Sequence, residues 1–169
     1  CYVGGLQEWQ GIERMLNIVS KLDCYLLLVG GTKEKQRELQ SQVYKKGIEK
    51  KVEFVGRVDH SNVPEYINRS DVCFGPFRSK RQASPMKIYE YLSCSKPVVL
   101  INDTGLEHVD EYPGVYRLSS SMTDSEIASF IENQSFNLYN NDDGREFVLN
   151  NHSWKSVVEQ IDSNVRSIC

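Results

Sequence analysis

The chain has 169 residues, a formal net charge of −3 and 40% hydrophobic residues. This length suffices for one domain with a sizeable core. The slight acidity argues against a broad nucleic-acid-binding face, so we predict no nucleic-acid partner. No apolar run approaches the roughly 20 residues that span a membrane.

The cysteines and histidines are spread along the chain. The five cysteines stand at positions 1, 24, 73, 94 and 169 without a CxxC pair. This pattern favours buried free thiols in a reducing compartment over a metal site. His60, His108 and His152 also lack the spacing of metal ligands. We therefore predict no metal centre.

Strand-like and helical patterns alternate along the sequence. Apolar runs predict strands over residues 2–4, 24–30, 52–55, 71–75, 97–101 and 115–118. Helical patterns cover 11–22, 33–46 and 63–68, a helix from Pro85, a helix opened by the capping box Thr123–Glu126, and 145–149 and 154–167. Residues 136–144 are rich in Asn and Asp and predict a surface loop. The alternation predicts a single α/β domain with a Rossmann-like, doubly wound parallel sheet of about six strands.

Ligands of such sheets bind outside the carboxyl ends of the strands. Gly5, Gly30-Gly31 and Gly56-Arg57 follow predicted strands and belong to this rim. The two glycines at 30 and 31 fit either a phosphate cradle or a tight turn, and the dinucleotide fingerprint GxGxxG is absent. Arg57 fits either a base-stacking residue or a surface arginine.

The segment 82–101 carries the most informative signal. Ser84 is suited to an N-cap and Pro85 to the first helical position, so free N–H groups would face an anion. Lys87 lies in the first turn, where a cation opposes the helix dipole by up to ~1 kcal/mol unless an anion is near. The alternative is a surface pair between Lys87 and Glu90, three residues on.

This segment resembles the donor-binding core of retaining glycosyltransferases with the GT-B fold, the group 1 glycosyl transferase family. Glu90 is followed seven residues later by Pro97, which opens a Val-Val strand. In that family such a glutamate holds the ribose of a nucleotide-sugar, and a second glutamate eight positions earlier contacts the donor sugar. Gln82 stands at that earlier position and keeps hydrogen-bonding capacity without charge. The resemblance runs from Tyr2 to about Trp154.

The resemblance implies a set of site residues. Gln82, Lys87 and Glu90 are assigned to catalysis. The family places an arginine and a lysine after the first strand, where this chain has Gln7 and Gln10. A cationic loop at residues 78–81 is expected to replace them, the alternative being a solvated loop. The expected donor-binding residues are Gly5, Gly30, Gly31, Gly56, Arg57, Arg78, Lys80, Arg81, Ser84 and Met86.

The resemblance further implies that residues 1–169 form the C-terminal donor-binding domain of a cytoplasmic retaining hexosyltransferase of polysaccharide biosynthesis. The partner would be an N-terminal acceptor domain of the same protein, absent from this chain. Peripheral association with a membrane through that domain is compatible with this assignment. No cofactor is expected beyond the nucleoside diphosphate sugar, and the chain alone would be inactive. Two alternatives remain: a GT-B-fold epimerase, and a non-catalytic nucleotide-sugar-binding module, which Gln82 and the absent cations suggest.

Overall fold

The computed structural model describes residues 1–76, 86–101, 106–134, 136 and 141–166. This part of the chain contains parallel strands in two sheets, which confirms the α/β prediction. The strands are β1 (Tyr2–Gly4), β2 (Leu26–Gly30), β3 (Val52–Gly56), β4 (Cys73–Pro76), β5 (Val98–Ile101) and β6 (Val115–Leu118). All four strand pairings within the sheets are parallel.

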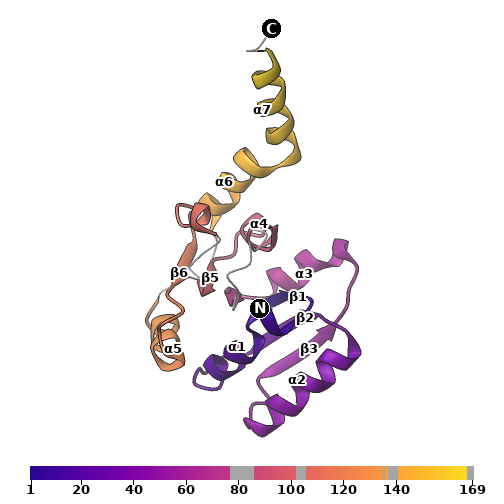
Figure 1. Ribbon diagram of the computed structural model, residues 1–169, viewed down its shortest axis with the longest axis vertical. Coiled ribbons are helices and arrows are strands. Elements are labelled where there is room, and N and C mark those ends of the chain that lie inside the picture. Colours follow the sequence, from indigo (N-terminus) through magenta and orange to yellow (C-terminus); the bar gives the residue numbers. More distant parts are fainter. Residues whose placement is uncertain (77–85, 102–105, 135, 137–140, 167–169) are drawn as a thin grey trace.

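Helices connect the strands and extend the chain beyond the last one (Figure 1). The α-helices are α1 (Ile12–Val19), α2 (Lys33–Lys45), α3 (Val63–Asn68), α4 (Met86–Ser93), α5 (Asp124–Asn133), α6 (Asp142–His152) and α7 (Trp154–Arg166). Short 3-10 helices are η1 (Glu8–Gln10), η2 (His60–Asn62) and η3 (Glu107–Val109). Helix α7 projects away from both sheets (Figure 1).

The two sheets meet at β1 and β4. The Cys1 nitrogen donates to the Val72 carbonyl at 2.6 Å, and the Phe74 N–H donates to the Cys1 carbonyl at 2.8 Å. Within the sheets the orders are β1-β2-β3 and β4-β5-β6, so the overall order is β3-β2-β1-β4-β5-β6. This is the doubly wound Rossmann order, in which the direction of winding reverses between β1 and β4.

Apolar side chains leave the strands toward both faces, as strands covered on both sides require. On β2, Leu26 and Leu28 join one cluster while Leu27 and Val29 join the other. The first cluster packs against α1, α2 and α5. The second packs against α3, α4 and α6. The sheets are therefore the middle layer of three.

The predicted loop at 136–144 is wrong at both of its described ends. Phe136 is buried in the first cluster, and residues 142–144 already belong to α6. The Asn141 side chain accepts a hydrogen bond from the Gly144 N–H at 3.2 Å and caps the helix. Asn and Asp favour helix starts as much as turns, because their side chains satisfy free N–H groups. Residues 137–140 lie outside the described part.

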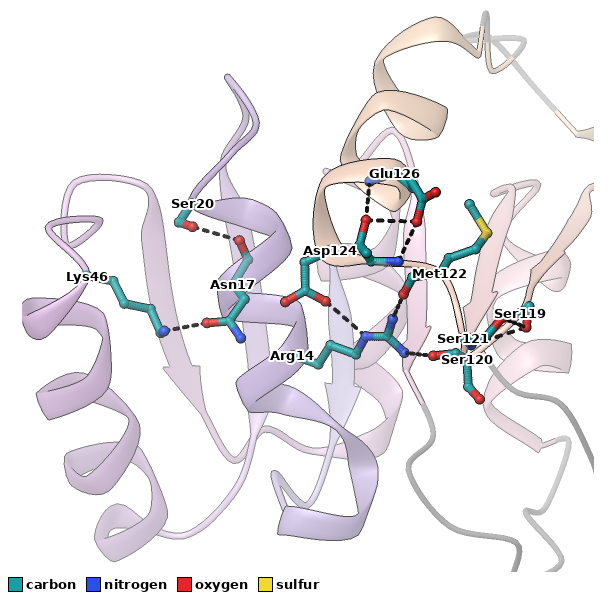
Figure 2. A network of polar contacts seen from close by, with 11 residues as sticks. Arg14, Asn17, Ser20, Lys46, Ser119, Ser120, Ser121, Met122, Asp124 and Glu126 are labelled. Carbon is teal, nitrogen blue, oxygen red and sulfur yellow. Dashed lines mark hydrogen bonds and ion pairs between the residues drawn. The ribbon is translucent and has the colours of Figure 1, made fainter.

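A polar network ties the two halves of the fold together on the face of α1 and α5. Figure 2 shows Arg14 of α1 reaching the segment that leads into α5. Its Nε donates to Asp124 at 3.0 Å, Nη1 donates to the Ser120 carbonyl at 3.0 Å, and Nη2 donates to the Met122 carbonyl. Thr123 and Glu126 complete the predicted capping box at the start of α5.

Candidate functional site

The backbone pairing between β1 and β4 stops short of the carboxyl ends of the strands. Continuing the pairing of Cys1 with Phe74 would require an N–H from residue 76, and Pro76 has none. Further along β1, the Val3 N–H donates at 2.9 Å to the hydroxyl of Tyr91, which α4 inserts between the sheets. The two sheets therefore separate where ligands bind in folds of this order.

Lys87 lies beside β1, near the point where this pairing stops. Its Nζ donates to the Tyr2 hydroxyl at 2.8 Å and lies 4.0 Å from the centre of the Tyr2 ring. A Cβ built on Gly4 would lie 2.9 Å from Lys87 Nζ, so the ammonium is held directly above the backbone of β1. The first turn of α4 thus presents a cation at the carboxyl end of the central strand.

Burial lowers the pKa of Lys87 to about 8, and the nearby Glu90 carboxylate opposes this change. The amine is therefore charged at neutral pH, although partial loss of hydration destabilises this charged form. An anion beside Lys87 would stabilise the charged form.

Glu90 lies one helical turn beyond Lys87 on α4. Its Oε1 contacts His60 Nε2 of η2 at 2.9 Å. The Glu90 side chain is 31% exposed and that of His60 is 86% exposed, so this pair lies at the surface. Both residues line a largely apolar cavity of about 460 Å³ between α3, α4 and the junction of α6 with α7. Glu90 can accept hydrogen bonds from a ligand at the mouth of this cavity.

The glycines at the end of β2 allow close packing against β1 and the residues that follow it. Gly30 and Gly31 have φ values of +109° and +73°, which L side chains rarely adopt. A Cβ on Gly30 would collide with the Gly4 carbonyl oxygen, and one on Gly31 would collide with Leu6. The Gly30 carbonyl accepts a hydrogen bond from Gln36 at 3.1 Å. The close approach of Gly4 and Leu6 accounts for the missing side chains at Gly30 and Gly31.

The loop after β1 carries Gly5 and two glutamines in place of cations. Residues 8–10 form η1, a short helix that the sequence analysis missed. Gln10 is buried, and its side-chain oxygen accepts a hydrogen bond from the Gln7 N–H at 2.9 Å. Gln10 therefore stabilises its own loop.

The other predicted residues fall at the rim or outside the described part. Arg57 follows Gly56 at the end of β3 and is exposed. Met86 begins α4, is 60% exposed and lines the cavity beside Glu90. Gln82, Arg78, Lys80, Arg81 and Ser84 lie outside the described residues.

The described residues bring together Lys87, Glu90, Met86 and the loop that contains Gly5. The sequence analysis missed three partners: Tyr2, His60 and Tyr91. No local pattern marks them, because each contacts α4 or β1 from at least 30 residues away. Among the described residues no group of histidines, cysteines and carboxylates could hold a metal ion. None of their helices is both long and apolar enough to cross a bilayer.

Comparisons with known proteins agree with this geometry. Residues 1–111 match the family of group 1 glycosyl transferases. An uncharacterized glycosyltransferase of Methanocaldococcus jannaschii is 22% identical over 95% of this chain and 43% of its own length. The crystal structure of Anabaena HepE in complex with UDP superposes with a TM-score of 0.80, at 19% identity, over 98% of this chain and 48% of HepE.

A sucrose-phosphate synthase from Thermosynechococcus elongatus superposes with a TM-score of 0.81, at 21% identity, over 99% of this chain and 44% of that protein. The chain thus spans less than half the length of these relatives. Its architecture is that of the C-terminal domain of a GT-B glycosyltransferase. The family match covers more than half of the chain, and the chain belongs to the group 1 glycosyl transferases.

Proposed function

We propose that the chain is the donor-binding domain of a retaining hexosyltransferase, which transfers a sugar from a nucleoside diphosphate sugar to an acceptor. One observation carries the proposal: α4 places the Lys87 ammonium over Gly4, at the carboxyl end of β1, and the Glu90 carboxylate one turn further on. HepE, which has the same fold, has been solved with UDP and with UDP-glucose.

The two side chains fit the two chemical parts of such a ligand. During transfer the bond between the anomeric carbon and the diphosphate oxygen breaks, and negative charge develops on the leaving diphosphate. The Lys87 ammonium would stabilise that charge. The Glu90 carboxylate would accept hydrogen bonds from the two ribose hydroxyls. Gln82, Arg78, Lys80 and Arg81 are proposed to complete the donor site from the preceding loop, without a metal ion or cofactor.

The acceptor and the rest of the reaction would come from a second domain. We propose an N-terminal GT-B domain of the same protein as the partner, a cytoplasmic location and a product whose anomeric configuration is retained. The 169-residue chain alone would then bind the nucleotide without turnover.

A second candidate is a nucleotide-sugar-binding module without turnover. It is favoured by the loop after β1, which contains no Lys or Arg between Gly4 and Glu13. It shares the ligand of the first candidate and differs only in the chemical step.

Calorimetric titration of the chain with UDP, GDP and ADP tests the shared part of the proposal. At least one nucleoside diphosphate should bind more tightly than either its nucleoside or inorganic pyrophosphate. Absence of binding at millimolar concentrations of all three would contradict the proposal. Incubation of the full-length protein with a nucleotide-sugar then separates the candidates, because only the enzyme forms a glycoside, whose anomeric coupling constant reports retention.

A further inference from the structure

We propose that Tyr2 is a positioning residue for Lys87: its buried phenol holds the ammonium over Gly4, in the charged form that binds the diphosphate of a nucleotide-sugar. The inference deepens the proposed function and rests on it. It concerns a residue of β1 that no sequence motif marks, and it assigns Tyr2 no direct contact with the ligand.

The geometry shows that Tyr2 contacts the ammonium in two ways. The hydroxyl accepts a hydrogen bond from Nζ at 2.8 Å, and the ring centre lies 4.0 Å from the same atom. The Tyr2 side chain is fully buried, so its position is fixed by the core around β1. A flexible lysine side chain is thereby restricted to one place over Gly4, which reduces the ordering cost of binding an anion there.

Gly4 keeps that place open. A Cβ on Gly4 would lie 2.9 Å from both Lys87 Nζ and the Tyr2 hydroxyl oxygen. The absence of a side chain therefore lets the pair reach the carboxyl end of β1. The adjoining loop supplies no cation of its own, since its polar residues are Gln7, Glu8 and Gln10. In the described part of this rim, Lys87 thus occupies the place where a diphosphate needs positive charge.

The role of the Tyr2 hydroxyl can be measured through the pKa of Lys87, which depends on the groups around the ammonium. Burial lowers the pKa of Lys87 to about 8, and Glu90 on the same helix opposes the change. Tyr2 faces the ammonium from β1, and Tyr91, one turn along α4, faces Val3 of the same strand. His60 contacts Glu90 from η2. The Tyr2 hydroxyl favours the charged lysine, because a hydrogen bond to an ammonium is stronger than one to a neutral amine.

Tyr2→Phe removes the hydroxyl and keeps the ring, so the fold and the cation–π contact are retained. The pKa of Lys87 should then fall by about one unit. Since only the protonated lysine attracts the diphosphate, the loss of UDP affinity with rising pH should begin about one unit lower. The variant and the wild type should bind UDP equally at pH 6 and differ by up to about tenfold at pH 9.

The test combines two measurements on the 169-residue chain. NMR of ¹³Cε-labelled lysine, assigned with Lys87→Met, gives the pKa of Lys87 without any ligand. Calorimetry with UDP between pH 6 and 9 gives the pH profile of binding. Tyr112→Phe is the matched control: it deletes the hydroxyl of another buried tyrosine, hydrogen-bonded to His152 at 2.9 Å, and should change neither the pKa of Lys87 nor the profile.

The outcomes distinguish this inference from the proposed function. A lower pKa of Lys87 in Tyr2→Phe, together with the shifted UDP profile, supports the inference. An unchanged pKa, or an unchanged profile in a chain that binds UDP, overturns it and leaves the proposed function standing. Failure of the wild type to bind UDP or any other nucleoside diphosphate at every pH overturns the proposed function, and the ligand role of Tyr2 with it. Gly4→Ala provides a second variant, which should displace Nζ and weaken UDP binding at pH 6 as well.

Discussion

The hydroxyl of Tyr91 accepts a hydrogen bond from the backbone N–H of Val3 at 2.9 Å, across the line where the two sheets meet. Tyr91 comes from α4, is fully buried, and replaces the backbone acceptor that a continuous sheet would offer to β1. Pro76 prevents the next backbone hydrogen bond from β4. Two residues thus stop the pairing of β1 with β4 near the position of Lys87.

Tyr91→Phe should destabilise the chain by about 1–3 kcal/mol, because it leaves the Val3 N–H buried without an acceptor. Urea denaturation followed by circular dichroism measures this loss in free energy of unfolding. Tyr89→Phe is the matched control, since the Tyr89 hydroxyl lies 3.5 Å from that of Tyr112 in a less buried place. The free energy of unfolding should fall less in Tyr89→Phe than in Tyr91→Phe. Equal losses of stability in both variants would show that the hydrogen bond from Val3 to the Tyr91 hydroxyl adds no particular stability where the two sheets meet.

Regular elements could be predicted from the sequence because their signals are local. The apolar run that contains β2 alternates between the two cores, and the capping box of Thr123 and Glu126 starts α5 where it was expected. The doubly wound parallel arrangement also follows from general rules for α/β chains, whereas the strand order does not, because more than one order obeys those rules. The start of α6 was missed, because Asn and Asp at residues 141–143 fit a turn and a helix cap equally well.

The candidate site could be predicted only in part. Lys87 and Glu90 could be proposed from the sequence because both lie on one helix in a recognisable motif. Their partners could not: Tyr2 is 85 residues from Lys87 and His60 is 30 residues from Glu90. Such contacts depend on how helices and strands pack together, so short sequence patterns cannot predict them. Gly30 and Gly31 illustrate the same limit, since only the neighbouring loop shows why those positions lack side chains.

Arg14→Ala should lower the free energy of unfolding by about 1–3 kcal/mol, because three contacts between α1 and the segment before α5 are lost together. Arg14→Lys should recover only part of this loss, since a single ammonium cannot reproduce the planar set of donors. Urea denaturation measures both variants.

Lys35→Ala is the control for this prediction. It breaks the exposed pair with Glu38 on α2, where the two charged atoms are 2.7 Å apart. Exposed pairs contribute about 0–1 kcal/mol, so the control should change stability little. If Arg14→Lys were as stable as the wild type, charge rather than geometry would account for the network shown in Figure 2.

Lys87→Met should weaken binding of UDP and of pyrophosphate by about 1–3 kcal/mol each, because both ligands lose the same charge-assisted contact. Lys155→Met, which removes an exposed charge on α7, should bind both ligands like the wild type. Calorimetry at pH 7 gives the affinities. Equal affinities in Lys87→Met and the wild type would reduce Lys87 to a structural residue.

Lys87 should also impose a pH dependence on stability. Its pKa is lowered to about 8 in the folded chain, so between pH 8 and about 10 the unfolded chain holds more protons. The contribution of Lys87 to the free energy of unfolding therefore rises with pH across that window, and it falls again as the pH is lowered through it. The difference in stability between the wild type and Lys87→Met, measured by thermal unfolding, should change with pH across this window, because the other buried groups titrate in both proteins. Parallel curves would indicate that the pKa of Lys87 is normal.

Glu90→Ala should lower affinity for a nucleoside diphosphate but leave affinity for inorganic pyrophosphate unchanged. The reason is that pyrophosphate carries no ribose to donate hydrogen bonds to the carboxylate. In the free chain the carboxylate contacts the exposed His60 at 2.9 Å, and a ribose would supply neutral donors in addition or instead. The measurement is the ratio of the two dissociation constants, obtained by calorimetry for the wild type and the variant.

His60→Ala distinguishes a contact between Glu90 and the ribose from a structural role of the His60–Glu90 pair. It removes the protein partner of Glu90 and leaves the carboxylate in place, so the ratio of the two dissociation constants should stay near that of the wild type. Because the His60–Glu90 pair is exposed, its loss should alter stability by less than about 1 kcal/mol. If Glu90→Ala weakened both ligands equally, the carboxylate would act by orienting α4 and Lys87, and the assignment of Glu90 to the ribose would be wrong for this chain.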